Sequence, residues 1–209
     1  MKEELTEIIF ILDRSGSMGG LESDTIGGFN AMLAKQKKVP GEARVTTVLF
    51  DDQYELLHHR IPLEGICPLT DKEYYVRGCT ALLDAIGKTI HQLVHTLKHT
   101  TEDYRPEKVI FIITTDGLEN ASKEYSYSKL KQMIKHQTEK YHWEFLFMGA
   151  NIDAIAEASK LGIKEDRAVT YENNAEGVAL NYEVIADTLE QVRVCKEPLR
   201  ADWKKRIEK

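Results

Sequence analysis

The sequence predicts an α/β protein built on a doubly wound, mostly parallel sheet with helices on both faces. Short apolar runs rich in β-branched residues alternate along the chain with longer stretches of helical periodicity. Such alternation is typical of right-handed βαβ crossovers, which produce parallel sheets. Several of the apolar runs are followed at once by small polar residues, and the 209 residues suffice for one sizeable core.

The apolar runs are expected to be strands. The first, at 7–12, ends at Asp13, and the run at 108–114 (K-V-I-F-I-I-T) is the clearest of them. A tight turn at Asp51-Asp52 joins the second run to the third. The expected strands are 7–12, 44–50, 54–59, 108–114, 143–148 and 167–171.

Helices are expected between these strands. Residues 80–99 show the clearest pattern, with apolar side chains at helical spacing. A stretch around Phe29 ends near Pro40-Gly41, and Gly162 ends a short helix. The other expected helices are 126–140, 152–161 and 175–194. We find no internal repeat and no linker, so residues 1–195 are expected to form one domain. Residues 196–209 are expected to be a charged tail or a short helix.

Composition excludes several classes of function. With 28 Lys and Arg against 34 Asp and Glu, the formal net charge is −6, which gives no attraction to nucleic acid or to anionic lipid. No basic, apolar leader and no run long enough to cross a bilayer is present in the sequence. The three cysteines, Cys67, Cys79 and Cys195, have no C-x-x-C spacing and do not suggest a disulfide framework or a zinc site. We therefore expect a reducing, cytoplasmic setting.

Polar residues gather at the ends of two expected strands and before the clearest helix. In an open parallel sheet, a ligand lies beyond the carboxyl ends of the strands. There the sequence offers two carboxylates and three hydroxyls: Asp13, Ser15, Ser17, Thr80 and Asp116. An oxygen-only set of this kind suits Mg²⁺, Mn²⁺ or Ca²⁺ and not soft metals.

Each of these features has a structural explanation when taken alone. Asp13-x-Ser15-x-Ser17 could shape a turn, Thr80 could cap a helix, and Asp116-Gly117 is a turn signal. Their joint occurrence after strands and before a helix favours a metal site.

The set resembles the metal-ion-dependent adhesion site (MIDAS) of von Willebrand factor type A (VWA) domains. Asp13-x-Ser15-x-Ser17, Thr80 and Thr115-Asp116-Gly117 occur in family order, and the resemblance covers about residues 5–193. It implies a Rossmann-like sheet with one antiparallel edge strand, at 54–59. It also implies that Asp13, Ser15, Ser17, Thr80 and Asp116 are the metal-binding set.

The resemblance implies a binding module and not an enzyme. The cofactor would be Mg²⁺, with Mn²⁺ or Ca²⁺ as alternatives, and the partner would be a protein that offers an Asp or Glu carboxylate to the ion. We find no convincing general base, so no catalytic residue is assigned. Neither a nucleic acid nor a membrane is expected as a partner.

An alternative is a Mg²⁺-dependent phosphotransferase of the haloacid-dehalogenase-like type. Such an enzyme uses an Asp nucleophile after the first strand and a second Asp two residues later. Here the second position is Ser15, and Lys108 or Lys123 would have to act as the lysine partner. The glycine-rich phosphate-binding motifs of nucleotide-binding proteins are absent from the sequence.

Three histidines, His91, His95 and His99, recur at intervals of four residues on the expected helix 80–99. One helix offers at most two usable metal ligands without a third from elsewhere. We interpret this stripe as a solvent-facing surface.

Overall fold

The computed structural model of the protein describes residues 1–195 and 197–208. Its centre is a six-stranded sheet in the order β3-β2-β1-β4-β5-β6. The strands are β1 (Lys2–Asp13), β2 (Ala43–Phe50), β3 (Tyr54–Pro62), β4 (Pro106–Thr115), β5 (Glu144–Ala150) and β6 (Ala168–Tyr171). β3 runs antiparallel to β2, whereas the other neighbouring pairs are parallel, as the fold prediction required. Strand order reverses between β1 and β4, so ligands are expected beyond the carboxyl ends of this pair.

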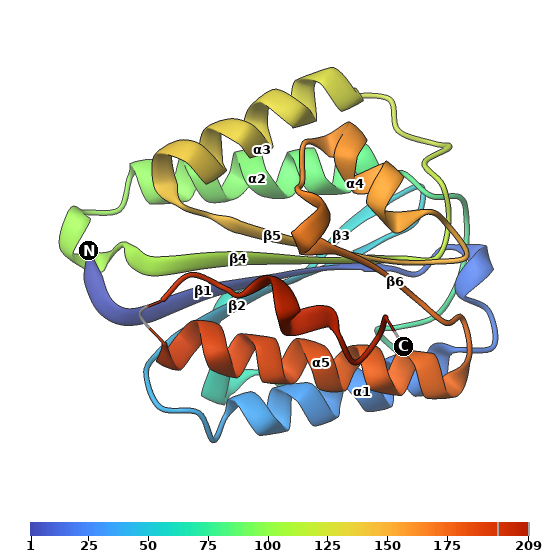
Figure 1. Ribbon diagram of the computed structural model, residues 1–209, viewed down its shortest axis with the longest axis horizontal. Coiled ribbons are helices and arrows are strands. Elements are labelled where there is room, and N and C mark those ends of the chain that lie inside the picture. The colour runs from blue at the N-terminus through green and yellow to red at the C-terminus, as the bar shows by residue number, and fades with distance from the viewer. Residues whose placement is uncertain (196, 209) are drawn as a thin grey trace.

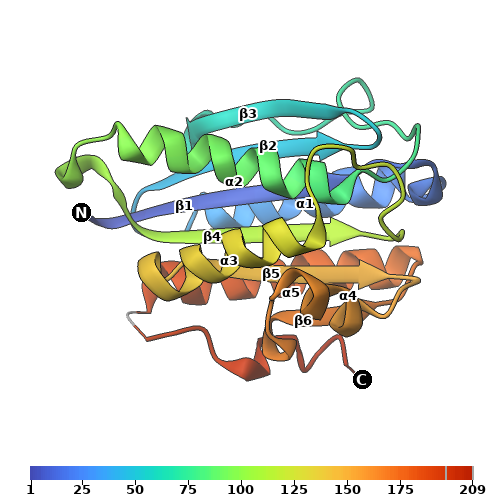
Figure 2. The ribbon, with the colours of Figure 1, turned by 90° about the horizontal axis from the view of Figure 1, so that it is seen from above.

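Helices cover both faces of the sheet (Figure 1). The helices α1 (Glu22–Gln36) and α5 (Ala175–Val194) lie on one face. The opposite face carries α2 (Leu82–Lys98), α3 (Tyr127–Tyr141) and α4 (Ala154–Leu161), which Figure 2 shows from above. Alternate side chains of β1 point to opposite faces, so Phe10 enters the core under α1 and α5 and Ile11 the core under α2 and α3. The apolar runs of the sequence therefore reflect burial on both sides.

Some element ends differ from the predictions. β1 begins at Lys2 and not at residue 7, because its polar start pairs with the start of β4 through an irregularity between Lys2 and Thr6. β3 extends to Pro62. α2 begins at Leu82 and Ala81 occupies its N-cap position, so Thr80 lies before the helix and does not cap it.

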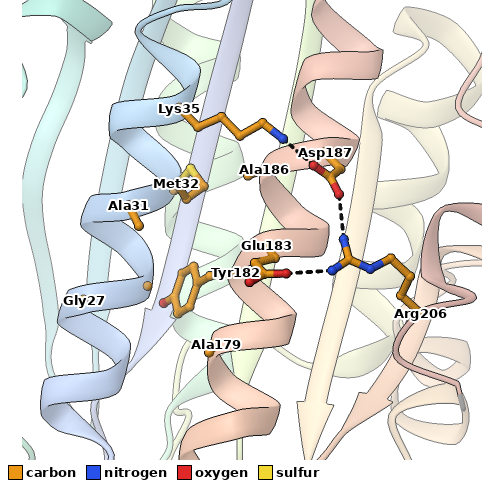
Figure 3. A pocket seen from close by; sticks show the side chains of 11 residues that line it. Gly27, Ala31, Met32, Lys35, Ala179, Tyr182, Glu183, Ala186, Asp187 and Arg206 are labelled. Carbon is orange, nitrogen blue, oxygen red and sulfur yellow. Dashed lines mark hydrogen bonds and ion pairs between the residues drawn. The ribbon is translucent and has the colours of Figure 1, made fainter.

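Small residues allow α1 and α5 to approach closely. A Cβ atom on Gly28 would lie only 2.4 Å from Cδ2 of Tyr182, whereas one on Gly27 would meet nothing within 4 Å. Beside this contact is a groove of about 450 Å³ between the two helices (Figure 3). At its rim Lys35 of α1 forms an ion pair with Asp187 of α5. Arg206, from the C-terminal segment, pairs with the same Asp187 carboxylate.

The C-terminal segment packs against β6 and α5. Leu199 and Trp203 are buried in the core under α1 and α5, and Trp203 lies in a short 3-10 helix, Ala201–Lys204. The Trp203 Nε1–H donates to the carbonyl of Asp166 at 2.7 Å. Residue 196, where the predicted tail begins, and residue 209 lie outside the described residues. None of the described helices combines the length and the apolar character needed to cross a membrane.

Candidate metal centre

The carboxyl ends of β1 and β4 bring the two predicted carboxylates together. β1 pairs directly with β4, with Leu12 opposite Thr114, so Asp13 and Asp116 leave neighbouring strands at the same edge. The sheet order, which the sequence left open, thus makes the strands that carry the two acids neighbours. Asp13 is 1% exposed and Asp116 is 3% exposed, so both carboxylates are largely removed from water.

Hydrogen bonds link the serines of the first loop to both acids. Oδ1 of Asp13 accepts the backbone N–H of Ser15 at 2.7 Å, and its Oδ2 accepts the Thr115 hydroxyl at 2.6 Å. The Ser17 hydroxyl donates to Oδ1 of Asp116 at 2.5 Å and lies 3.1 Å from Oγ of Ser15. Four of the five predicted oxygen donors are therefore joined in one contiguous network.

Thr80 reaches the same place from the loop before α2. A Cβ atom on Gly117 would lie 3.2 Å from Oγ1 of Thr80 and 3.3 Å from Oγ of Ser17. The Thr80 and Ser17 hydroxyls therefore both lie beside Gly117, which has no side chain to fill the space between them. The Thr80 backbone is held from the β4 side, since its N–H donates to Oδ1 of Asn120 at 2.9 Å and its carbonyl accepts the Asn120 N–H at 3.0 Å.

One carboxylate oxygen of this cluster lacks a partner. Oδ2 of Asp116 is buried and accepts no hydrogen bond within the described part of the chain. A buried polar oxygen without a partner is costly, and a cation would satisfy it. Two carboxylates roughly neutralise a divalent ion, and hydroxyl oxygens are suitable further ligands. The residues present therefore fit a hard divalent cation.

Histidine and cysteine do not contribute to this centre. No group of three or more His, Cys, Asp or Glu side chains in residues 1–195 and 197–208 is arranged to hold a metal. The set around Asp13 and Asp116 has only two such side chains, and its other three members are hydroxyls. Its oxygen-only chemistry favours Mg²⁺, Mn²⁺ or Ca²⁺ over softer ions.

Burial dominates the electrostatics of the two acids. Desolvation raises the pKa of Asp13 to about 6, although hydrogen bonds from Thr115 and Ser15 lower it, and the charge of Asp116 adds to the rise. Desolvation also raises the pKa of Asp116, against the hydrogen bond from Ser17. Two desolvated like charges destabilise one another, and a bound cation would relieve this repulsion.

Arg14 is a residue whose role the sequence did not reveal. Its side chain is fully buried and forms ion pairs with Oε2 of Glu55 at 2.7 Å and Oδ2 of Asp51 at 3.4 Å. Arg77 pairs with the same Asp51 carboxylate, and the Tyr75 ring contacts both guanidinium groups. Asp51 belongs to the tight turn that the sequence predicts between the second and third strands. The structure uses it for this ion-pair cluster and for accepting the N–H of Gln53.

The loop after β4 caps α2 from outside that helix. The Glu119 carboxylate accepts the N–H of Leu83 at 2.9 Å. In return Asp84 of α2 accepts the N–H groups of Lys123, Glu124 and Tyr125, each at 2.9 Å. Burial raises the pKa of Asp84, but these three donors outweigh it and hold the pKa below its usual range. Glu119 thus has a structural role at the start of α2.

Other residues near the carboxyl ends of the strands serve the fold or lie at the surface. Asp153 caps α4 by accepting the Ala156 N–H at 2.9 Å. Cys79 is exposed, directly before Thr80. Met18 is buried. The cysteines at 67, 79 and 195 are all unpaired.

Comparison of sequences finds no relative: no family model matches the chain, and no curated protein matches it significantly. Comparison of structures finds proteins that share the fold. Proximal thread matrix protein 1 (PTMP1) from the mussel byssus superposes with a TM-score of 0.60 at 14% identity, over 89% of this chain and 46% of that one. This chain thus spans about half the length of PTMP1. A second structure of PTMP1 has a zinc-occupied MIDAS motif.

Two further structures are covered by this chain over a larger share of their length than PTMP1 is. The vWF domain of the type V pili tip protein Mfa5 from Porphyromonas gingivalis has a TM-score of 0.65 at 11% identity, over 92% of this chain and 97% of that one. Manganese-loaded TRAP protein from Plasmodium vivax has a TM-score of 0.56 at 16% identity, over 86% and 73%. Likeness at such identities establishes a shared fold.

Proposed function

We propose that this chain, which has the von Willebrand factor type A fold, is a divalent-cation-dependent protein-binding module. Asp13, Ser15, Ser17, Thr80 and Asp116 would hold the ion, with Mg²⁺ as the first candidate and Mn²⁺ or Ca²⁺ as alternatives. A protein partner would supply an Asp or Glu carboxylate as a further ligand. Catalysis is not part of this proposal.

The buried Oδ2 of Asp116, which accepts no hydrogen bond from any described residue, is the observation that carries the proposal. The oxygens around it come from three separate loops, and two of them face the space beside Gly117. Related folds add support, since PTMP1 has been seen with zinc in a MIDAS motif and TRAP with manganese.

Binding of an acidic partner agrees with the electrostatics of the site. The chain carries a net charge of −6, which would repel an acidic partner at long range. A bound divalent ion would be the largest local charge at the sheet edge and would reverse this preference within the site. Burial of Asp13 and Asp116 strengthens this local effect because it lowers the surrounding dielectric.

The phosphotransferase alternative gains no support from the structure. Lys108, one of its two candidate lysines, lies near the start of β4, at the opposite end of the strand from Asp116. Its ammonium donates to the carbonyls of Val192 and Cys195 at 2.8 and 2.9 Å, at the end of α5. Position 15 is a buried serine whose N–H stabilises Asp13, and no second acid stands there.

Isothermal titration of Mg²⁺ and Mn²⁺ tests the site directly. The wild type is expected to bind one ion, and Asp116→Ala is expected to lose that binding. Asp103→Ala is the matched control, because Asp103 is an exposed acid before the start of β4, at the other edge of the sheet. Equal heats from the wild type and Asp116→Ala would overturn the proposal.

Partner recognition needs a second experiment. A peptide with a single glutamate is titrated into the Mn²⁺-loaded protein, and the same peptide with glutamine is the control. We expect binding of the glutamate peptide only, and none after addition of a chelator. We also propose a cytoplasmic setting, in which the three unpaired cysteines would stay reduced.

A further inference from the structure

A pair of histidines at the far end of α2 has geometry that the metal centre does not explain. The rings of His95 and His99 have centroids 4.6 Å apart, with 55° between their planes. Both residues are exposed, and neither ring takes part in a hydrogen bond or ion pair with any other described residue. His91, one turn earlier, makes no such ring contact with His95 in the described structure.

The centroid separation allows two imidazoles to bind one ion. A metal–nitrogen distance of about 2.0 Å and roughly 1.1 Å from the nitrogen to the ring centre place each centroid about 3.1 Å from the metal. Two such rings at 90° then have centroids about 4.4 Å apart, and at the tetrahedral angle about 5.1 Å apart. The observed 4.6 Å is nearer to the 90° arrangement.

This arrangement selects among metals. Ligand–metal–ligand angles of 90° are typical of square-planar, tetragonal and octahedral ions. Imidazole also binds Cu²⁺ and Ni²⁺ more strongly than it binds most other divalent ions. The pair also lies at the carboxyl end of α2, where the helix dipole favours positive charge. Imidazoles at positions i and i+4 share one face of a helix, which lets both reach one ion.

We propose that His95 and His99 form a second metal site, a two-imidazole chelate for Cu²⁺ or Ni²⁺ whose other positions are filled by water. It is separate from the oxygen site, because Thr80 lies before the start of α2 and the 17 residues of that helix span about 25 Å. Its preference among metals is also opposite to that of the oxygen site, because Mg²⁺ and Ca²⁺ bind oxygen and have little affinity for imidazole. The solvent-facing stripe of the sequence thus contains one chelating pair and one separate histidine.

Competing ligands must be blocked in the test. The three exposed cysteines would bind Cu²⁺ and Ni²⁺ themselves, so their thiols are first alkylated. Excess Mg²⁺ in every sample occupies the oxygen site. Ni²⁺ is then titrated calorimetrically, and Cu²⁺ is added for electron paramagnetic resonance, in which imidazole nitrogens produce hyperfine splitting.

We expect one Ni²⁺ per chain and two-nitrogen coordination of Cu²⁺ in the wild type. His95→Gln and His99→Gln should each weaken Ni²⁺ binding about tenfold or more, because a chelate becomes a single ligand. His91→Gln is the matched control on the same helix face and should change the affinity less than twofold. Unchanged affinity in either pair variant, or equal weakening in His91→Gln, would overturn the proposal. Circular dichroism of each variant verifies that the helix content is unchanged.

Discussion

Arg14 and Asp51 form an ion pair between two side chains that are both fully buried, with Nε and Oδ2 3.4 Å apart. Arg14 stands between Asp13 and Ser15 of the metal centre, and its N–H donates to the carbonyl of Phe50 at the end of β2. Its own carbonyl accepts the N–H of Arg77, on the segment that leads to Thr80. The pair therefore connects the two loops that supply the hydroxyl oxygens.

Replacing Arg14 should destabilise the fold. Arg14→Met leaves Asp51 and Glu55 without one of their cations, and removal of one partner from a buried pair costs about 3 kcal/mol. Urea denaturation measures the change in the free energy of unfolding. Lys2→Met is the control, because Lys2 and Glu42 form an exposed pair worth less than about 1 kcal/mol. Similar small effects from both variants would show that the buried pair contributes little.

Replacing Asn120 should weaken metal binding, if the proposed function holds. Asn120→Ala removes the acceptor for the Thr80 N–H and frees the loop that positions the Thr80 hydroxyl. Asn120→Asp keeps an acceptor oxygen at the same place and is expected to retain Mn²⁺ affinity. Calorimetric titration compares the two variants with the wild type. Identical Mn²⁺ affinity in Asn120→Ala and the wild type would contradict this positioning role.

The two glycines of α1 should respond oppositely to alanine. Gly28→Ala places a methyl group against the Tyr182 ring and should destabilise the protein by about 1–3 kcal/mol. Gly27→Ala adds a better helix former in open space and should stabilise it by up to about 1 kcal/mol. Thermal unfolding of the two variants checks this, and a higher melting temperature for Gly28→Ala would refute the close contact of α1 and α5.

Asp84 should make the free energy of unfolding depend on pH. Its folded-state pKa lies below the unfolded value of about 3.9 because three backbone N–H groups bind the carboxylate, although burial opposes them. Its contribution is therefore complete above about pH 5 and is lost as the pH falls through the unfolded and then the folded pKa. We expect the stability difference between the wild type and Asp84→Asn to shrink between pH 5 and pH 2, as measured by urea denaturation. A difference that stays constant over this range would contradict the role of the charged form.

The C-terminal segment should contribute to the core. Trp203 is buried against α5 and hydrogen-bonded to the Asp166 carbonyl. Trp203→Ala should therefore lower the free energy of unfolding by about 3 kcal/mol. Lys205→Ala, at an exposed neighbour, should change the free energy of unfolding by less than about 0.5 kcal/mol. If the tryptophan variant is as stable as the lysine variant, the segment does not stabilise the domain.

The sequence by itself determined the fold class and placed Asp13 and Asp116 at the carboxyl ends of two strands, which the structure shows to be neighbours. Its apolar runs match the period and length of buried strands, and parallel strands necessarily end at the same edge. Local patterns also predicted the bounds of α2 and of α5 close to those observed, because helical periodicity depends on residues that are neighbours in the sequence.

Only the tertiary structure decided how the loops at that edge are held. The partners Arg14 and Asp51, Thr80 and Asn120, and Glu119 and Leu83 lie more than 35 residues apart, where no local spacing reports contact. Arg14 looks like an exposed loop residue in the sequence, yet it is buried because acids from another loop compensate its charge. Spacing likewise brought His95 and His99 to one helix face, but the rotamers that set their rings 4.6 Å apart belong to the folded chain.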